Sequence, residues 1–503
     1  MTGALGIVLV VLLLGLLAVA LRTAIASPFR ALGILVAGMA VHNFLLMILL
    51  RLGTPDLLVR LIQAWKEIIL LALLGVALWT GSRRWQAGSR PRLRPIDGLV
   101  VAFAIVALIY FVLPGSLLQS HATLTQRVLG LRVLLLIPVL YLFGRIFPPR
   151  GRSDLTWTAT LIVGAAGLVG LFGMIELWLV PTAQWLGWGV NQLSAWLGFT
   201  YHGPSGLPEN FFQTTAEGIL LRRMVSTYVS PLAIAYTGLL VVPLGIALLL
   251  DRHPRLRSFA AVALGLALLG ILFSVTRLAL AALVAEWALL YVLWRRRWLI
   301  PATLLVAGAV VLVIYQYPRI GPLVDRNLVA IGHRPTGMHF ASQSDPSAIE
   351  HLQELGKDVD FVRQHPLGAG LGSSVHRYGA TVGTGESAVL DVFGELGVVG
   401  GLLYIGIYLA GIVYGLRAFF RRRDDPLASA LGLTAAAGGL ALIPITLTSD
   451  IWSDFSVTFL FWWAVGYSVM LATTATTATT TLGRGRGPVT RFDGFTEPDS
   501  LVV

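Results

Sequence analysis

Apolar runs about as long as a membrane is thick follow one another along almost the whole chain. A transmembrane helix needs about 20 mainly apolar residues, and about thirteen segments of the 503-residue chain meet this requirement. They are 3–21, 31–50, 62–81, 97–114, 127–147, 156–178, 229–250, 258–276, 278–294, 298–316, 389–416, 428–448 and 454–472. Only 12% of the residues are charged, against about 25% in soluble proteins. We therefore expect an all-α polytopic membrane protein with about 12 to 13 transmembrane helices.

The basic residues are concentrated in short clusters between the apolar runs. The formal net charge is +12, but this clustering is typical of loops that stay in the cytoplasm, so it argues against nucleic-acid binding. The clusters are 82–95, 145–152, 251–257, 295–297 and 421–423. The remaining loops alternate with them, which places the N-terminus outside and the C-terminus inside. The basic segment 51–67 falls outside on this count, and its alternative interpretation is an interfacial amphipathic helix.

Two less apolar segments separate the groups of expected helices. The sequence therefore divides into N-terminal transmembrane helices (1–178), an outer aromatic loop (179–228), further transmembrane helices (229–316), a large extracytoplasmic loop (317–388), C-terminal transmembrane helices (389–472) and a disordered cytoplasmic tail (473–503). The first apolar run has no cleavage signature after it, so we expect it to be retained as a span. The tail is rich in Thr and Gly and low in complexity, which is typical of disorder.

Four arginines are expected at the outer membrane face. Arg132 lies inside an apolar run, Arg222 and Arg223 directly precede another, and Arg277 lies in a tight turn between two runs. Guanidinium groups suit bidentate binding of phosphate oxygens, whereas a single arginine at a helix end is often a snorkelling anchor. Because several separate segments contribute, the pattern favours a phosphate site. Arg222 is the member most typical of a plain anchor.

The segment 317–388 ends with Glu386, just before an apolar helix. A carboxylate at this position acts as a general base in one interpretation, and stabilises the helix dipole in the other. Asp391 follows inside the expected span. The glycine-rich run HPLGAGLGSS (365–374) lacks the Gly-Lys-Ser/Thr ending of a Walker A loop. We interpret it as a turn that lays the loop across the membrane surface.

No cofactor and no metal site are expected. The chain has no cysteine, which excludes disulfides and thiolate ligands. His365 and His376 lie in the large loop without the spacing of metal ligands.

Two further segments at the outer face have amphipathic or aromatic character. Apolar residues recur at helical spacing in 348–364, which predicts an amphipathic helix lying on the membrane or covering the site. The stretch 178–203 contains four tryptophans. They indicate an interfacial belt, with stacking on sugar rings as the alternative.

Four motifs, within about residues 215 to 415, resemble those of the O-antigen ligase and O-antigen polymerase superfamily. LRRMVSTYVSPLAIAY is similar to the family's Arg-x-x-Gly-Thr-Phe-x-x-Pro-Asn segment, with Arg223 at the arginine, and SVTRLALAAL resembles its Ser-x-Ser-Arg turn, with Arg277 at the arginine. HPLGAGLG is similar to His-Pro-Leu-x-Gly-x-Gly-x-Gly. ESAVLDVFGELGVVGG resembles His-Asn-x-x-Leu-x-x-x-x-Glu-Leu-Gly-x-x-Gly, but has Glu386 where ligases have histidine. This difference favours a polymerase-like protein over a strict ligase.

The resemblance implies a glycosyltransferase-C-like fold and a glycosyltransferase of the bacterial cytoplasmic membrane. Its donor would be an oligosaccharide on polyprenyl (undecaprenyl) diphosphate, and its acceptor would be a glycan or a lipid. Membrane lipids would surround the protein. Arg223, Arg277 and Arg132 would hold the diphosphate, with Arg277 also stabilising the departing charge. Glu386 would accept the proton of the acceptor hydroxyl without any metal. The accessory candidates are Arg222, His365 and Asp391.

A transporter or flippase of a lipid-linked or anionic substrate is the alternative function, because it also uses arginines within the membrane. Such proteins commonly contain internal pseudo-symmetry and broken helices in matching halves. The sequence shows no such symmetry.

Overall fold

The computed structural model describes residues 2–86, 93–118, 122–198, 206–214, 220–322, 346–373 and 387–473. Within these ranges, 13 helices are long and apolar enough to cross a membrane. The expectation of an all-α polytopic membrane protein is confirmed, and each helix coincides with one of the expected apolar runs. The expected tail and Glu386 lie outside the described residues.

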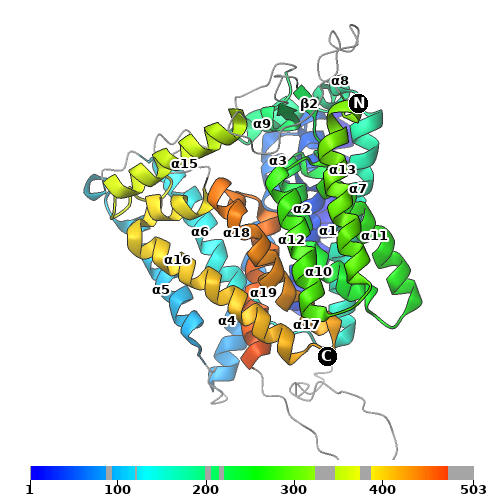
Figure 1. Cartoon of the computed structure of the whole chain (residues 1–503). Coiled ribbons are helices and arrows are strands. Elements are labelled where there is room, and N and C mark those ends of the chain that lie inside the picture. The colour runs from blue at the N-terminus through cyan, green and yellow to red at the C-terminus, as the bar shows by residue number, and fades with distance from the viewer. Residues whose placement is uncertain are drawn as a thin grey trace, which may run out of the picture.

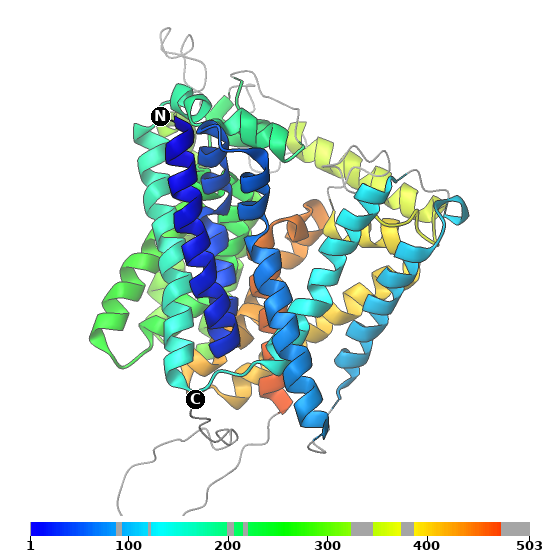
Figure 2. The same cartoon turned by 180° about the vertical axis from the view of Figure 1, so that it is seen from behind.

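The spanning helices alternate in direction along the chain (Figures 1 and 2). They are α1 (Thr2–Ala26), α2 (Pro28–Arg51), α4 (Trp65–Gln86), α5 (Pro95–Val112), α6 (Leu124–Ile146), α7 (Arg152–Leu179), α10 (Pro231–Leu249), α11 (Pro254–Phe273), α12 (Arg277–Trp294), α13 (Leu299–Ile320), α16 (Ala388–Arg421), the pair α17 (Pro426–Leu433) and α18 (Gly439–Thr448), and α19 (Phe455–Thr473). The π-helical turn η5 (Thr434–Gly438) joins α17 to α18.

Shorter elements gather at one end of the bundle, which we call the α15 end. They are α3 (Asp56–Gln63), η1 (Gly115–Leu117), α8 (Thr182–Gly187), α9 (Val190–Trp196), η2 (Glu209–Phe211), β1 (Phe212–Thr214), β2 (Leu220–Arg222), η3 (Ser226–Tyr228), α15 (Pro346–Gln364) and η6 (Ile451–Ser453). The antiparallel pair β1–β2 is an exception to the all-helical expectation. Helix α15 agrees with the amphipathic helix expected at 348–364, and the 51–67 segment contains the short helix α3.

Burial separates central helices from those that face the lipid. α10 and α19 are almost completely buried, whereas α1, α4, α5 and α13 are mostly exposed. Helix α19 packs against α6, α16 and α2, so it lies between the two groups of helices that Figure 1 shows on either side. An outer helix with an apolar exposed surface suits a lipid environment, because hydrocarbon does not penalise that surface.

The described residues of the basic clusters lie at the end opposite α15 (Figures 1 and 2). There Arg152 at the start of α7 donates to Asp251 at 2.8 Å and to Asp425 at 3.0 Å. Burial alone would raise the pKa of Asp251, but hydrogen bonds from the His253 backbone N–H and from Arg152 outweigh it and lower that pKa. This network ties the α6–α7, α10–α11 and α16–α17 connections together.

Helix α16 is interrupted at Gly397, whose φ of 67° is non-helical. The glycine-rich loop fills the interruption. Ala369 and Gly370 donate to the carbonyls of Gly394 (2.7 Å) and Glu395 (3.1 Å), and Val398 donates to Pro366 at 2.9 Å. Backbone groups freed inside a membrane need such partners. The loop therefore packs into α16, a contact that the sequence did not predict.

Candidate functional site

A cavity of about 220 Å³ opens at the α15 end of the bundle. Residues of α2, α4, α6, α10, α16 and α19 line it, together with the connections that lead into α10 and α19. Its polar lining side chains include His42, Asn43, Gln63, Lys66, Arg132, Tyr228, Ser230, Asp391, Glu395, Asp450, Ser453, Asp454 and Ser456. The cavity thus joins segments from both ends of the sequence.

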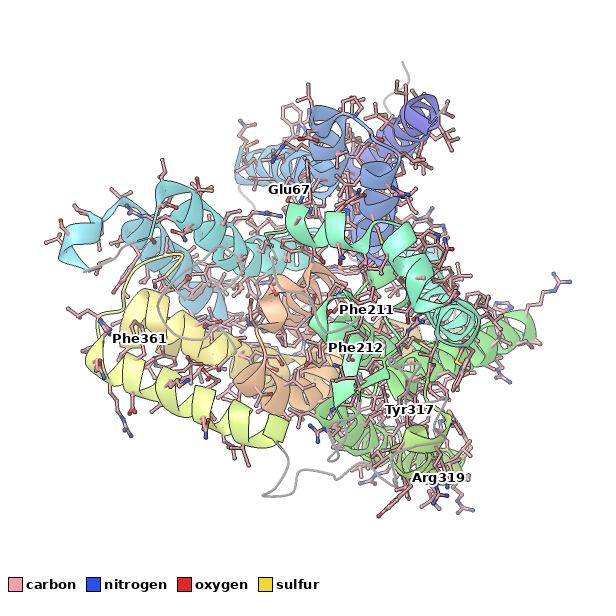
Figure 3. All side chains as sticks on the ribbon, turned by 90° about the horizontal axis from the view of Figure 1, so that it is seen from above. Glu67, Phe211, Phe212, Tyr317, Arg319 and Phe361 are labelled. Atoms are coloured by element: carbon pink, nitrogen blue, oxygen red, sulfur yellow. The ribbon has the colours of Figure 1, made fainter. Side chains whose placement is uncertain are left out.

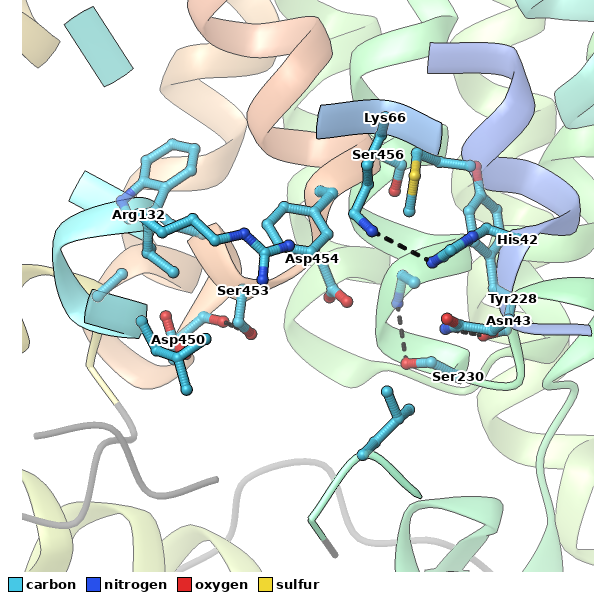
Figure 4. A pocket seen from close by; sticks show the side chains of 18 of the residues that line it. His42, Asn43, Lys66, Arg132, Tyr228, Ser230, Asp450, Ser453, Asp454 and Ser456 are labelled. Atoms are coloured by element: carbon cyan, nitrogen blue, oxygen red, sulfur yellow. Dashed lines mark hydrogen bonds between the residues drawn. The ribbon is translucent and has the colours of Figure 1, made fainter. Parts of the chain in front are cut away.

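Lys66 and His42 present nitrogen donors on one wall of the cavity, where they point toward one another (Figure 4). The Trp65 indole N–H donates to His42 Nδ1 at 3.1 Å. Since an indole only donates, Nδ1 accepts, and the ring carries its hydrogen on Nε2. That nitrogen lies 3.4 Å from Lys66 Nζ. Two donors do not satisfy each other, so an anionic oxygen beside both would receive a hydrogen bond from each.

Arg132 supplies a second cation to the cavity. Its guanidinium group lies 4.8 Å from the centre of the Phe455 ring, and Lys66 Nζ lies 5.2 Å from the same ring. Arg132 also pairs with Glu67 of α4. Figure 4 shows the Arg132 side chain extending toward Ser453 and Asp454. Because arginine and lysine approach one aromatic ring from two helices, their charges are concentrated at one point.

Carboxylates line the cavity from the α16 and α19 sides. Asp391 and Glu395 are one turn apart on α16, and therefore on one face of that helix. Asp450 and Asp454 flank η6. Asp391 is only half-buried, whereas Glu395 is 3% exposed. The cavity therefore combines cationic and anionic groups, with Asp391 the more accessible carboxylate of α16.

The glycine-rich loop positions Glu395. The backbone N–H of Gly372 donates to Glu395 Oε1 at 3.0 Å. A Cβ added at Gly372, whose φ is +76°, would lie 2.4 Å from the carbonyl oxygen of Gln126 on α6. Only glycine fits this close approach without strain. The loop, α6 and α16 are thus fixed to one another beside the cavity.

An apolar groove of about 270 Å³ adjoins the cavity. α4, α6 and α19 line it, mainly through Leu70, Leu71, Leu74, Leu135, Leu136, Val139 and Phe459. Lys66, Arg132 and Phe455 line both the groove and the cavity. Leu71 is 67% exposed, so the groove is open on the lipid-facing surface. A hydrocarbon chain in the groove would bring an attached polar group to these two cations.

Arg222 is in a buried ion pair and not in an interfacial position. It is 2% exposed and donates to Glu176 of α7 at 2.7 Å. The same carboxylate accepts from the backbone N–H groups of Val225 and Ser226. These contacts hold the chain that leads into α10, so the structure gives Arg222 an architectural role.

Arg223 and Arg277 lie together, apart from the residues that line the cavity. Arg223 donates to the Ser274 carbonyl (2.7 Å) and the Thr276 hydroxyl (2.8 Å), directly before Arg277. Burial lowers the pKa of Arg223 to about 10, with the nearby Arg277 contributing, so Arg223 remains charged at neutral pH. Of the sequence-predicted arginines, only Arg132 lines the cavity.

Figure 3, seen from the α15 end, labels one partner of Arg132 and one partner of Arg222. Glu67, the partner of Arg132, lies on the side where α4 meets α6. Tyr317, whose hydroxyl donates to the Arg222 carbonyl, lies on the opposite side.

The remaining candidates lie away from the cavity or outside the described residues. His365 stacks on Phe361 of α15 with ring centres 4.2 Å apart. Glu386 is not described, although the nearby Ala388 lines the cavity. Trp185 is fully buried and packs on Trp188, Phe44 and Phe211, so it is a core residue. Among the described residues, no group of three or more His, Asp or Glu side chains is arranged to hold a metal ion.

Sequence reasoning missed Lys66 and His42. A signal was present, because Lys66 lies in the basic segment 51–67 at the end of the bundle where the positive-inside rule predicts few cations. Burying a lysine there (Lys66 is 2% exposed) costs free energy, so such a residue is a candidate for a functional site. His42 lies inside an apolar run, and no local pattern distinguishes it from a buried polar residue.

Comparisons with known proteins add no assignment. No protein-family model matches the chain, and a search of the curated proteins finds no match.

Proposed function

We propose that this protein transfers a glycan from a polyprenyl diphosphate carrier to an acceptor hydroxyl inside the cavity. The observation that carries the proposal is the junction formed by Lys66, Arg132 and Phe455. An apolar groove on one side of it suits an isoprenoid chain, the cations suit the diphosphate, and the polar cavity suits the sugar. The motif resemblance to O-antigen polymerases and ligases supports the same substrate class.

The proposed reaction is a single nucleophilic displacement at the donor sugar. The acceptor oxygen attacks C1 of the donor sugar, and the bond from C1 to the diphosphate oxygen breaks, which inverts the configuration at C1. Lys66 and Arg132 stabilise the charge on the departing polyprenyl diphosphate. Asp391 takes the hydroxyl proton, because it is the more accessible carboxylate on the α16 face. Glu395, anchored by Gly372, orients the acceptor.

The proposed location is the outer face of a bacterial cytoplasmic membrane, and the proposed architecture is glycosyltransferase-C-like. Where the structure describes them, the basic clusters lie at the end of the bundle opposite the cavity. The positive-inside rule then orients the cavity away from the cytoplasm. Burial raises the pKa of Tyr228, at the cavity wall, to about 12, against hydrogen bonds with Thr237 and Ser456 that lower it, so its hydroxyl stays protonated.

The test is glycan transfer by the protein in lipid nanodiscs, with a polyprenyl diphosphate oligosaccharide as donor and EDTA present. Lys66→Gln and Arg132→Gln are each expected to reduce kcat by about 100-fold or more, the usual effect of removing one preorganised electrostatic group. Asp391→Asn is expected to reduce it by about 100- to 10,000-fold, the contribution of a general base.

Lys357→Gln and Arg363→Gln are the matched controls, because both side chains are exposed on α15. They should retain wild-type rates. Full activity of the Lys66 or Arg132 variant would contradict the proposal. Donor movement across the bilayer without transfer would identify a transporter instead. Chain growth without an added acceptor indicates a polymerase, and dependence on a separate acceptor indicates a ligase.

A further inference from the structure

Glu67 lines the groove beside Lys66 and Arg132, which line both the groove and the cavity. Its Oε1 pairs with Arg132, and its Oε2 lies 3.5 Å from Lys66 Nζ. One carboxylate thus bridges two cations that come from different helices. The side chains of Glu67 and Arg132 are each 34% exposed, while that of Lys66 is 3% exposed. The bridge lies at the lipid-facing side of the site, and not in its interior.

The Glu67 carboxylate leaves hydrogen-bonding capacity unused at this junction. Glu67 is the carboxylate that pairs with both cations; Lys66 also donates to the Gln63 carbonyl at 2.8 Å, and the His42 Nε2–H points at the same lysine. Glu67 Oε2 has no hydrogen-bond donor, although it is shielded from solvent. A ligand with more negative charge and more acceptor oxygens would satisfy these donors better than the carboxylate does. A diphosphate has both properties.

We propose that the Glu67 carboxylate competes with the diphosphate of the lipid ligand for binding to Lys66 and Arg132. The carboxylate pairs with both Lys66 and Arg132, which both lie beside the Phe455 ring. An arriving diphosphate displaces it, and its return competes with the spent polyprenyl diphosphate and accelerates product release. The identity of the ligand rests on the proposed function, but the competition itself rests on the observed ion pairs.

Binding measurements on the full-length protein in nanodiscs test this directly. The probes are polyprenyl diphosphate without sugar, the monophosphate and the alcohol of the same chain, and inorganic pyrophosphate. In Glu67→Gln, the diphosphate is expected to bind about tenfold more tightly, mainly through slower dissociation. The alcohol should bind equally to both proteins. If Glu67→Gln also binds inorganic pyrophosphate more tightly than wild type does, the effect lies in the diphosphate head group and not in the isoprenoid chain.

Asp360→Asn is the matched control, because it removes a carboxylate from an exposed ion pair on α15. It should leave every affinity unchanged. Unchanged or weaker diphosphate binding by Glu67→Gln would overturn the inference, since it would mean that Glu67 only supports Arg132. In turnover, Glu67→Gln should show a lower KM together with a lower kcat, whereas a purely structural defect would not lower KM.

A second variant covers the case in which Glu67→Gln does not fold. The chain has no cysteine, so Glu67→Cys introduces a single thiol. Attaching a negatively charged sulfonatoethyl group should restore fast dissociation, and attaching a neutral hydroxyethyl group should not. Equal dissociation after both modifications contradicts the inference. Wild-type protein that binds the diphosphate but transfers no glycan would refute the proposed function alone.

Discussion

At the scale of single residues, the position of Glu395 depends on a hydrogen bond from the backbone of Gly372. Gly372 donates its backbone N–H to Glu395 Oε1 and lies against Gln126 of α6. The sequence indicated a glycine-rich turn, but not the helix against which it packs. Hydrogen bonds between a loop and a helix interruption depend on tertiary packing, which local propensity does not encode.

Gly372→Ala is expected to damage the site. The new Cβ would meet the Gln126 carbonyl at 2.4 Å, and the φ of +76° disfavours alanine. We expect a loss of about 1 to 3 kcal/mol of stability, the usual cost of such a conformation, and at least a tenfold loss of transfer rate as Glu395 shifts. Thermal denaturation and the transfer assay measure the two effects.

Gly356→Ala on α15 is the control for that substitution. A Cβ at this helical position meets nothing within 4 Å, so stability should stay the same or rise slightly. If Gly372→Ala behaves like Gly356→Ala, Glu395 does not depend on the loop.

At the scale of elements, each spanning helix was predictable because an apolar run of sufficient length has few alternatives in a membrane. The ends of the helices were also predictable within a few residues, since polar and basic clusters mark them. The interruption of α16 at Gly397 was not, because ELGVVGG contains three glycines and nothing local selects one of them. The selection comes from the loop at Pro366–Gly372, which supplies the missing partners.

The connection at Asp251 predicts a pH-dependent contribution to stability. The pKa of Asp251 is lowered in the folded protein, mainly against the effect of burial, by hydrogen bonds from His253 and Arg152. A lowered folded-state pKa means that the contribution is complete above the unfolded value of about 3.9. It is lost as the pH falls through the folded-state pKa.

Asp251→Asn should therefore cost about 2 kcal/mol at pH 7, the contribution of hydrogen bonds to a charged group. The difference from wild type should shrink below about pH 4. Thermal denaturation in detergent at both pH values measures this. The exposed Asp424→Asn in the α16–α17 connection is the control, with no loss expected at either pH. A constant difference between wild type and Asp251→Asn across the pH range would show that the charge is not responsible.

At the scale of the whole molecule, the site combines residues that are far apart in the sequence. Lys66 comes from α4, Arg132 from α6, Asp391 from α16 and Asp454 from the start of α19. The sequence indicated that several arginines lie at one membrane face, and the structure separates them into two places. Helix packing order decides which cations share a site, and the spacing of apolar runs carries no information about that order.

A cryo-EM structure of the protein with a bound polyprenyl diphosphate glycan would locate the donor site. We expect the isoprenoid chain between α4, α6 and α19, with the phosphates within hydrogen-bond distance of Lys66 and Arg132 and Glu67 turned away. Phosphates bound at Arg223 and Arg277, with the chain along α12 or α13, would contradict this expectation.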